Sequence, residues 1–214
     1  MKKIFESKNI TEYAVIPFDE KLVINPRLMP EAEINSIVVF LVPYKSANTP
    51  KDKYGISAYA RVKDYHGYMK MLFAELIPEL NQKFGTDFFC FADHSPVNEK
   101  LCAAYGGLGV IGKNSLLINK KYGSYVFIGV CLTTLKTENI PMSIKGCINC
   151  GKCAERCPGC AITEQGIKAD KCLSGISQKK KITEWEENAM TTNPMVAGAR
   201  LVGAQADASR IAAA

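Results

Sequence analysis

The sequence predicts an α+β protein with one mixed domain and a small cysteine-rich module after it. Two apolar runs, residues 37–44 and 125–134, have the length of buried strands and are too short to span a bilayer. Between them, apolar residues recur with helical spacing. Six of the nine cysteines fall within residues 147–172. We therefore expect a main domain over 1–140, a cysteine-rich module over 141–185 and a tail over 186–214.

The first half of the main domain contains one strand and a helical segment. The strand is expected over residues 34–44 and ends at Pro43, and a polar loop with proline and glycine follows over 46–55. Ser57 is a suitable N-cap for one or two helices that close near Gly85. The apolar residues that predict these helices are Val62, Met69, Leu72, Phe73 and Leu76.

The second half is arranged around a glycine-rich turn, residues 106–114. Before the turn, a short strand over 88–91 leads to Asp93. Pro96 is expected to open a helix that runs to about Tyr105, because proline loses no hydrogen bond in the first helical turn. After the turn, two strands are expected over residues 115–119 and 125–134.

Charge and cysteine use indicate a cytoplasmic protein. The net charge is +6, but it is diffuse: residues 1–140 hold 17 basic and 14 acidic side chains, and the remainder 10 and 7. Such a charge does not by itself indicate a polyanionic partner, and neither apolar run predicts a membrane anchor. Residues 1–10 lack the apolar core of a signal peptide, so we expect reduced thiols. Cys90, Cys102 and Cys131 stand alone in apolar surroundings and are expected to be buried, inert thiols.

The glycine-rich turn fits two phosphate-binding patterns, and both are rejected. Residues 107–112 match G-x-G-x-x-G, and residues 107–113 match G-x-x-x-x-G-K. Both patterns need a strand before the glycines and a helix after them, but the predicted order here is the reverse. Asn114 also replaces the hydroxyl of the second pattern. Two interpretations stay open: a turn at which backbone segments pack closely, or a surface on which a flat ligand lies.

Two polar positions of the main domain could carry chemistry. Asp64, Tyr65 and His66 begin D-x-H-x-x-G, by which some enzymes ligate cobalt, but Met69 replaces the glycine. We therefore expect His66 on a helix surface or in a pocket rather than on a metal. Asp93 lies at the end of an apolar strand, where an aspartate is either a helix cap or an acid catalyst.

The cysteine segment, residues 147–172, carries the strongest motif. Cys147, Cys150, Cys153 and Cys157 follow C-x2-C-x2-C-x3-C-P, the spacing of bacterial ferredoxins. Two-residue spacers let three thiolates converge on one cluster. Zinc also accepts four cysteines, but this run of close steps before a proline favours iron–sulfur. The sequence therefore predicts a ferredoxin-like 4Fe-4S module that moves electrons toward chemistry in residues 1–140.

Four motifs in this order resemble the epoxyqueuosine reductases, cobalamin-dependent iron–sulfur enzymes of tRNA queuosine synthesis that are related to reductive dehalogenases. The motifs are YARVKDYH (59–66), FADHSPVNEKLCAAYGGLGVIGKNSLLI (91–118), YGSYVFIG (122–129) and the cysteine motif. The resemblance covers about residues 55–180. It implies a nitroreductase-like cobalamin-binding domain, a ferredoxin-like module, and an oxidoreductase that converts the epoxide of epoxyqueuosine in tRNA into an alkene.

The resemblance also assigns roles to residues. Asp93 matches the family's proton donor, and base-off cobalamin would lie between domain and module, with the glycine-rich turn as a wall of the corrin site. Electrons would come from an external donor such as a flavodoxin or ferredoxin, and tRNA would be the partner. The expected cobalamin contacts are Arg61, Tyr65, His66, His94, Ser95, Gly112, Lys113, Asn114 and Leu117.

Family members bind two 4Fe-4S clusters, and this chain departs from them there. The usual ligands would be Cys147, Cys150 and Cys153 for one cluster, with Cys157 and Cys172 for the other. Three further cysteines of the family pattern are absent after residue 172. Either the chain carries one cluster, with Cys157, Cys160 or Cys172 as fourth ligand, or residues 188–214 are not the natural continuation. The helical repeats by which longer members contact tRNA are not in this sequence.

Two other functions stay open. The protein could be a non-catalytic electron carrier whose main domain has lost its ligand, or a reductase of another small substrate. Lys2, Lys3 and residues 179–181, all lysines, could contact tRNA or simply face solvent.

Overall fold

The computed structural model describes residues 1–45, 58–61, 64–139, 141, 143–144, 146–177, 179–181, 183–184 and 186. The chain divides into two compact units, which are described separately. The first comprises residues 1–44, 64–112 and 116–147, and the second comprises 45–63, 113–115 and 148–214. The expected polar loop over 46–55 and all but one residue of the expected tail lie outside the described residues.

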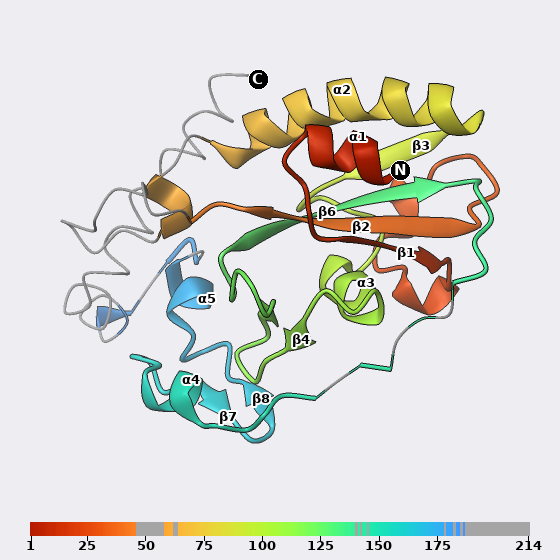
Figure 1. Cartoon of the computed structure of the whole chain (residues 1–214). Coiled ribbons are helices and arrows are strands. Elements are labelled where there is room, and N and C mark those ends of the chain that lie inside the picture. The colour runs from red at the N-terminus through yellow and green to blue at the C-terminus, as the bar shows by residue number, and fades with distance from the viewer. Residues whose placement is uncertain are drawn as a thin grey trace. The chain divides into compact units, whose positions relative to one another are not determined.

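The first unit is centred on a four-stranded antiparallel sheet with the order β1-β2-β6-β3 (Figure 1). The strands are β1 Tyr13–Pro17, β2 Ser36–Pro43, β6 Val126–Thr133 and β3 Phe88–Phe91. The two central strands pair along their whole length, from Ser36 opposite Thr133 to Pro43 opposite Val126. Seven consecutive residues of β2 are buried. This explains why its sequence is a continuous apolar run rather than an alternating one.

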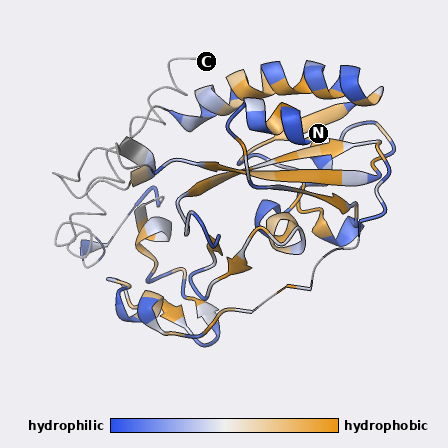
Figure 2. Cartoon of the chain, viewed as in Figure 1, coloured by the Kyte–Doolittle hydropathy of each residue, from blue (hydrophilic) through white to orange (hydrophobic). Residues whose placement is uncertain are grey.

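One face of the sheet is covered by α1 (Lys2–Ser7) and α2 (Tyr65–Phe84), which lie above it in Figure 1. Val38 and Phe40 of β2 point into this layer, because side chains of a strand alternate between its faces. The residues of α2 that pack here are Met69, Leu72, Leu76 and Leu80, spaced by three or four. Much of the remaining surface of α2 is hydrophilic (Figure 2).

The opposite face is covered by α3, Glu99–Tyr105. Ile37 and Val39 of β2 pack there with Cys102 and Ala103 of the helix. The same core cluster contains Leu117, from the small hairpin that follows. The hairpin is formed by β4 Val110–Ile111 and β5 Leu117–Ile118, and two short 3-10 helices, η1 Glu20–Leu22 and η2 Pro26–Leu28, complete the unit.

In the second unit, the described residues form short elements. These are the 3-10 helix η3 Ala58–Arg61, α4 Lys152–Glu155, the hairpin of β7 Ile162–Thr163 and β8 Gly166–Ile167, and α5 Leu173–Ser177. In the part of the chain that the structure describes, no helix is both long and apolar enough to cross a membrane.

Most predicted elements of the main domain are confirmed, but the helix after Asp93 begins later than expected. The strand over 88–91 and the helix end at Gly85, a left-handed C-cap, are as predicted. Helix α3 begins at Glu99 rather than Pro96. Residues 96–98 instead pair with residues 22–25: the Pro96 carbonyl accepts a hydrogen bond from Ile24 N–H, and Asn98 N–H donates to Leu22.

The expectation of three inert free thiols is wrong for two of them. Cys90 of β3 and Cys131 of β6 lie directly opposite each other and form a disulfide. Their positions in the sequence, 41 residues apart, could not show that the two strands are neighbours. Cys102 is a free, buried thiol as predicted. Burial, and then the charge of Glu99, raises its pKa to about 12, which makes it unreactive.

Candidate functional site

Asp93 lies in the turn between β3 and α3, with its side chain 64% exposed. Its φ of 66° is in the left-handed region, which few residues other than glycine and the short polar ones adopt. Asp93 does not cap α3, because Asn98 does so by accepting the N–H of Leu101 at 3.2 Å. Of the two interpretations of Asp93, the helix cap is therefore excluded.

The first turn of α2 brings two aromatic side chains to Asp93. The Tyr65 hydroxyl lies near enough to the Asp93 carboxylate for the carboxylate to affect its pKa. Nε2 of His66 lies 3.5 Å from Asp93 Oδ2. Burial, followed by the nearby negative charge of Asp93, raises the pKa of Tyr65, so this hydroxyl keeps its proton. The Tyr65 ring is fixed by stacking on Phe127 of β6, with centroids 4.4 Å apart.

His66 is oriented by the residue that starts the helix. Asp64 is the N-cap of α2 and accepts the His66 backbone N–H at 3.1 Å. The same oxygen lies 2.9 Å from His66 Nδ1, and these contacts lower the pKa of Asp64. The ring nitrogen that remains, Nε2, is the one directed at Asp93. His66 is thus a helix-terminal residue of a polar site, and its predicted roles stay predictions.

Glu99, the first residue of α3, is the fourth member of the site. Its Oε1 is inaccessible to solvent and has no hydrogen-bond partner among the described residues. Burial raises the pKa of Glu99 to about 8, and the charge of Asp93 adds to this, while the backbone N–H of Asp93 acts in the other direction. Sequence reasoning missed Glu99, because an acidic residue in a first helical turn is common at exposed helix ends. Tyr65, His66, Asp93 and Glu99 are called the Asp93 cluster below.

The other residues predicted to contact a corrin have varied surroundings in the first unit. Ser95 is buried, and its Oγ accepts the Val97 N–H at 3.3 Å, whereas His94 is exposed. Gly112 is buried and donates its N–H to Leu116, and Leu117 belongs to the hydrophobic core. The side chain of Arg61 lies outside what the structure describes. The role of each as a cofactor contact stays a prediction.

The glycine-rich turn begins where α3 ends, contains β4 and is followed by β5, so a helix precedes it and a strand follows it, which confirms the order that excludes both phosphate-binding patterns. A Cβ on Gly109 would lie 2.7 Å from the backbone oxygen of Ile118. A Cβ on Gly106 would lie 2.7 Å from the Cβ of Ala14. Both distances are shorter than real Cβ atoms tolerate, so close backbone packing accounts for these two glycines.

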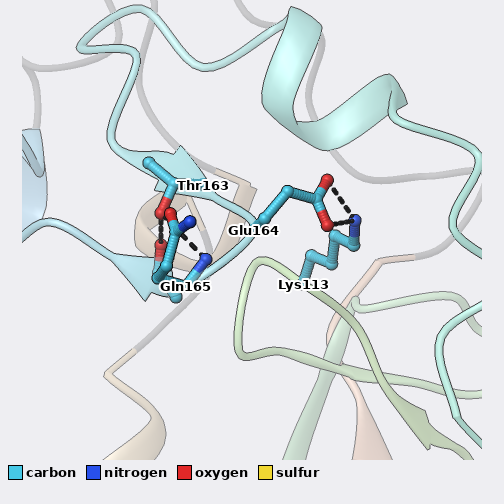
Figure 3. A network of polar contacts seen from close by, with 5 residues as sticks. Lys113, Thr163, Glu164 and Gln165 are labelled. Carbon is cyan, nitrogen blue, oxygen red and sulfur yellow. Dashed lines mark hydrogen bonds and ion pairs between the residues drawn. The ribbon is translucent and has the colours of Figure 1, made fainter.

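Lys113, in the second unit, forms an ion pair with Glu164 (Figure 3). Its Nζ lies 2.6 and 2.7 Å from the two carboxylate oxygens. Glu164 is in the turn of the β7–β8 hairpin, which Thr163 closes by donating to the Gly166 carbonyl at 2.8 Å and accepting the Gln165 N–H at 3.3 Å. The lysine of the glycine-rich turn therefore has a carboxylate partner.

The cysteine segment supplies free thiols on short elements. Cys153 lies on α4, whose N-cap is Gly151, a glycine in the left-handed conformation. Cys157 Sγ accepts the Ala161 N–H at 3.3 Å, a contact typical of cluster ligands, whose sulfurs are tuned by backbone N–H groups. Within the described residues, no three cysteine, histidine or carboxylate side chains converge on one metal position. The donor chemistry and spacing thus fit an iron–sulfur cluster, although the thiols are not gathered around one.

Comparison with known proteins identifies relatives of this chain. The family model described as epoxyqueuosine reductase QueG, DUF1730, matches residues 25–94. An epoxyqueuosine reductase of Leadbetterella byssophila is 32% identical over 173 residues, which are 79% of this chain and 56% of that protein. The chain spans about half the length of the curated relatives it matches.

Solved structures share the fold. An epoxyqueuosine reductase from Streptococcus thermophilus matches with a TM-score of 0.74 and 21% identity, over 91% of this chain and 61% of that one. An epoxyqueuosine reductase solved with an epoxyqueuosine-modified tRNA-Tyr stem loop matches with a TM-score of 0.67 and 20% identity, over 85% of this chain and 58% of that one. A reductive dehalogenase described with a mechanism for B12-dependent dehalogenation matches with a TM-score of 0.56 and 16% identity, over 97% of this chain and 35% of that one. The mixed helix-and-sheet architecture predicted from the sequence is confirmed.

Proposed function

This chain belongs to the epoxyqueuosine reductase family, and we propose that it is an oxidoreductase that reduces the epoxide of epoxyqueuosine in tRNA to an alkene. The observation that carries this proposal is the Asp93 cluster. The relationship covers 79% of the chain, and an exposed carboxyl lies close to a tyrosine hydroxyl and to an imidazole. The name of the solved tRNA stem-loop complex supports tRNA as the carrier of the substrate.

The reaction defines what the protein must provide. Removing the oxygen of an epoxide to leave an alkene takes two electrons and two protons and releases one water. Without a proton, the oxygen would leave as a poor leaving group, so an acid positioned beside it accelerates the step. Asp93 is our candidate for this role, and the Tyr65 hydroxyl and the His66 imidazole beside its carboxyl support the proposal.

Two cofactors would supply the electrons. A 4Fe-4S cluster would be held by Cys147, Cys150 and Cys153, with Cys157, Cys160 or Cys172 as fourth ligand. The proposal needs one such cluster and does not depend on a second. Cobalamin, the cofactor in the name of the dehalogenase neighbour, would supply strongly reducing two-electron chemistry at the substrate. Arg61, Lys113 and Asn114 remain proposed cobalamin contacts along with the residues of the first unit.

The finer assignments belong to the same proposal. The main domain would be nitroreductase-like and the cysteine segment ferredoxin-like, in a cytoplasmic protein served by an external donor such as a flavodoxin or ferredoxin. The shared fold with B12-dependent dehalogenases supports the pairing of these two parts.

The test is anaerobic reconstitution of the chain with iron, sulfide and cobalamin, followed by single-turnover reduction of epoxyqueuosine in a tRNA stem loop. Asp93→Asn is expected to slow turnover roughly 10²- to 10⁴-fold, because an amide cannot donate the acid proton. Asp87→Asn, an exposed aspartate before β3, is the matched control and should act like the wild type. Full activity of Asp93→Asn would remove Asp93 from the mechanism.

The same experiment separates the rival function. A chain that binds the cluster, transfers electrons to a dye and fails to bind cobalamin would be an electron carrier. About four iron and four sulfide ions per chain would indicate one cluster, and about eight of each would indicate two.

A further inference from the structure

The cysteine segment is strongly basic when it is separated from the residues that follow it. Residues 148–181 hold seven basic and three acidic side chains, so they supply +4 of the net charge of +6. Residues 182–214 hold two basic and four acidic side chains, which hides this concentration when the C-terminal part is counted as a whole. The positive charge of the chain is therefore concentrated around the free thiols.

Two of these cations lie on the helix that carries Cys153. Lys152 is the first residue of α4 and Arg156 is its C-cap, and the Arg156 N–H donates to the Lys152 carbonyl at 3.2 Å. Residues four apart on a helix are neighbours on its surface, so the two side chains emerge on the same side. Helix α4 is also in contact with β7 of the nearby hairpin (Figure 1).

Two lysines pack against the turn over residues 157–160, which holds two further thiols. The Lys168 N–H donates to the carbonyl of Ala161, directly after this turn, at 2.8 Å. A Cβ on Gly159 would collide with the carbonyl oxygen of Lys171, so the backbone of this lysine lies against the turn itself. The sequence separates these lysines from the turn by several residues, and the fold brings them back to it.

All four cations are exposed, and their charge is not neutralised within the unit. In the part of the chain that the structure describes, none of the four forms an ion pair. By contrast, Lys179 is paired with Glu186 at 2.5 Å, and Glu164 is occupied by Lys113. We call the four exposed cations the basic surface: Lys152, Arg156, Lys168 and Lys171.

Two exposed isoleucines accompany the basic surface. Ile148 is 84% exposed, and the chain turns tightly between it and Lys152, because Asn149 and Gly151 both have left-handed backbone angles. Ile167 of β8 is 38% exposed and directly precedes Lys168. Transient protein interfaces combine a small apolar centre with a polar rim. Contacts to nucleic-acid phosphates use cations and polar groups, and need no exposed aliphatic side chains.

From this combination we propose that the basic surface, together with its two isoleucines, is the docking site of the external electron donor, a small protein with an acidic surface around its redox group. The inference rests on the proposed function in taking the cysteine segment to hold a 4Fe-4S cluster that receives electrons. In the complex the donor loses one electron and the cluster gains it, and no bond forms or breaks.

The chemistry of the reaction fits this kind of interface. Reduction of one epoxide takes two electrons, so a one-electron donor must bind and leave twice in each turnover. Attraction between opposite charges accelerates encounter, and a small contact area allows rapid dissociation. The cations lie beside the thiols, so an acidic donor that binds them is also brought close to the cluster.

The test uses the full-length protein, reconstituted anaerobically with iron and sulfide, and flavodoxin as the acidic donor. The affinity for oxidised flavodoxin is measured by titration calorimetry, and reduction of the cluster by reduced flavodoxin is followed by stopped-flow spectroscopy. The test variant is Lys152→Glu with Lys168→Glu. The matched control is Lys70→Glu with Lys83→Glu, which changes the net charge equally at two exposed lysines of α2.

We expect the affinity of the wild type for flavodoxin to fall about tenfold between about 50 mM and about 300 mM salt. The test variant should bind flavodoxin at least about tenfold more weakly at low salt, with a smaller salt dependence, and the control should stay within about twofold of the wild type. Photoreduced deazaflavin, a small uncharged reductant, should reduce the cluster equally fast in all three proteins.

Two further measurements guard against an indirect effect. Iron content shows whether the charge changes disturb the cluster, and Lys152→Gln with Lys168→Gln should weaken binding in the same direction by a smaller factor. Ile148→Ser should weaken binding about threefold without changing the salt dependence, because it removes apolar contact and no charge.

Unchanged affinity for flavodoxin in the test variant, with the cluster intact, would overturn the proposal. So would a loss of affinity for a tRNA stem loop without any loss for flavodoxin, because the basic surface would then be an RNA-binding one. Binding needs no turnover, so the two hypotheses fail separately. A chain that docks flavodoxin at this surface and accepts its electron, but does not reduce epoxyqueuosine, keeps the docking site and refutes the proposed function.

Discussion

The Asp93 cluster and the cysteine segment differ in what holds their reactive groups in place. In the Asp93 cluster, two helices and a turn beside a buried sheet bring Tyr65, His66, Asp93 and Glu99 close together. In the cysteine segment, the thiols lie on short elements, and no three of the described ligand-type side chains converge on one metal position. The first site is organised by the hydrophobic core. The second would take its geometry from the group it binds, as small metal sites commonly do.

The largest effect is expected from removing a thiol. Cys153→Ala should abolish binding of iron and sulfide, because Cys153 is a ligand in every assignment of the cluster. Amide exchange at residues 88–98 should stay unchanged, since the hydrophobic core, and not the iron–sulfur cluster, organises the side chains around Asp93. Iron analysis, visible spectra and exchange on the same sample make the measurement.

Cys102→Ala is the control, because this buried thiol lies outside the cysteine segment. It should keep its iron. If Cys153→Ala also kept its iron, the ferredoxin motif would not be a cluster site. If the Asp93 turn loosened in Cys153→Ala, the two sites would not differ as described.

An intermediate effect is expected from disturbing the sheet. A Cβ on Gly129 of β6 would lie 2.3 Å from the ring of Phe40, which is fully buried. Gly129→Ala should lower the free energy of unfolding by about 3 kcal/mol through overpacking and accelerate exchange at Asp93. The affinity for iron should not change. Denaturant titration, exchange and iron analysis give the three readouts.

Gly67→Ala provides the matched control on α2, where an added Cβ meets nothing within 4 Å. Alanine is the better helix former, so this variant should be more stable by about 0.5–1 kcal/mol. An equal loss of stability in both variants would mean that the contact with Phe40 is not the cause.

The two sites also differ in how far the sequence revealed them. The cysteine motif was readable because its ligands are adjacent in the chain, so spacing alone carries the chemistry. In the Asp93 cluster only Asp93, Tyr65 and His66 were named, and their roles came from family resemblance. Glu99 was missed, because its burial depends on how α3 packs against the sheet. The pairing of Cys90 with Cys131 was missed for the same reason: strand order is a long-range property.

Local sequence signals predicted the helices and strands better than the residues at which they begin and end. Apolar runs located β2 and β6, and a glycine located the end of α2. Pro96 did not start α3, because its carbonyl is bonded to a distant segment near Ile24. Local sequence signals predicted helix α3, and a hydrogen bond to a distant segment moved its first residue from Pro96 to Glu99.

The smallest effect tests whether the Asp93 cluster lowers the free energy of unfolding in a way that the cysteine segment does not. In the folded protein, burial raises the pKa of Glu99 from 4.5 to about 8, whereas the unfolded chain releases this proton near 4.5. Between these values the folded state binds the extra proton, so stability decreases as pH rises and levels off above about 8. Between about pH 5.5 and about pH 7, this contributes a loss of about 2 kcal/mol in the free energy of unfolding.

Glu99→Gln should remove that slope, and Glu31→Gln, which changes an exposed glutamate, should keep it. Urea titrations of the three proteins at several pH values make the comparison, and parallel curves for wild type and Glu99→Gln would show that Glu99 is not held neutral by the fold. A confirmed slope means that the fold retains a buried acid at the expense of stability. Such a cost is expected at a preorganised active site, where the core imposes an arrangement that the side chains would not adopt alone. Free thiols that gather only around a bound cluster impose no cost of this kind on the folded chain.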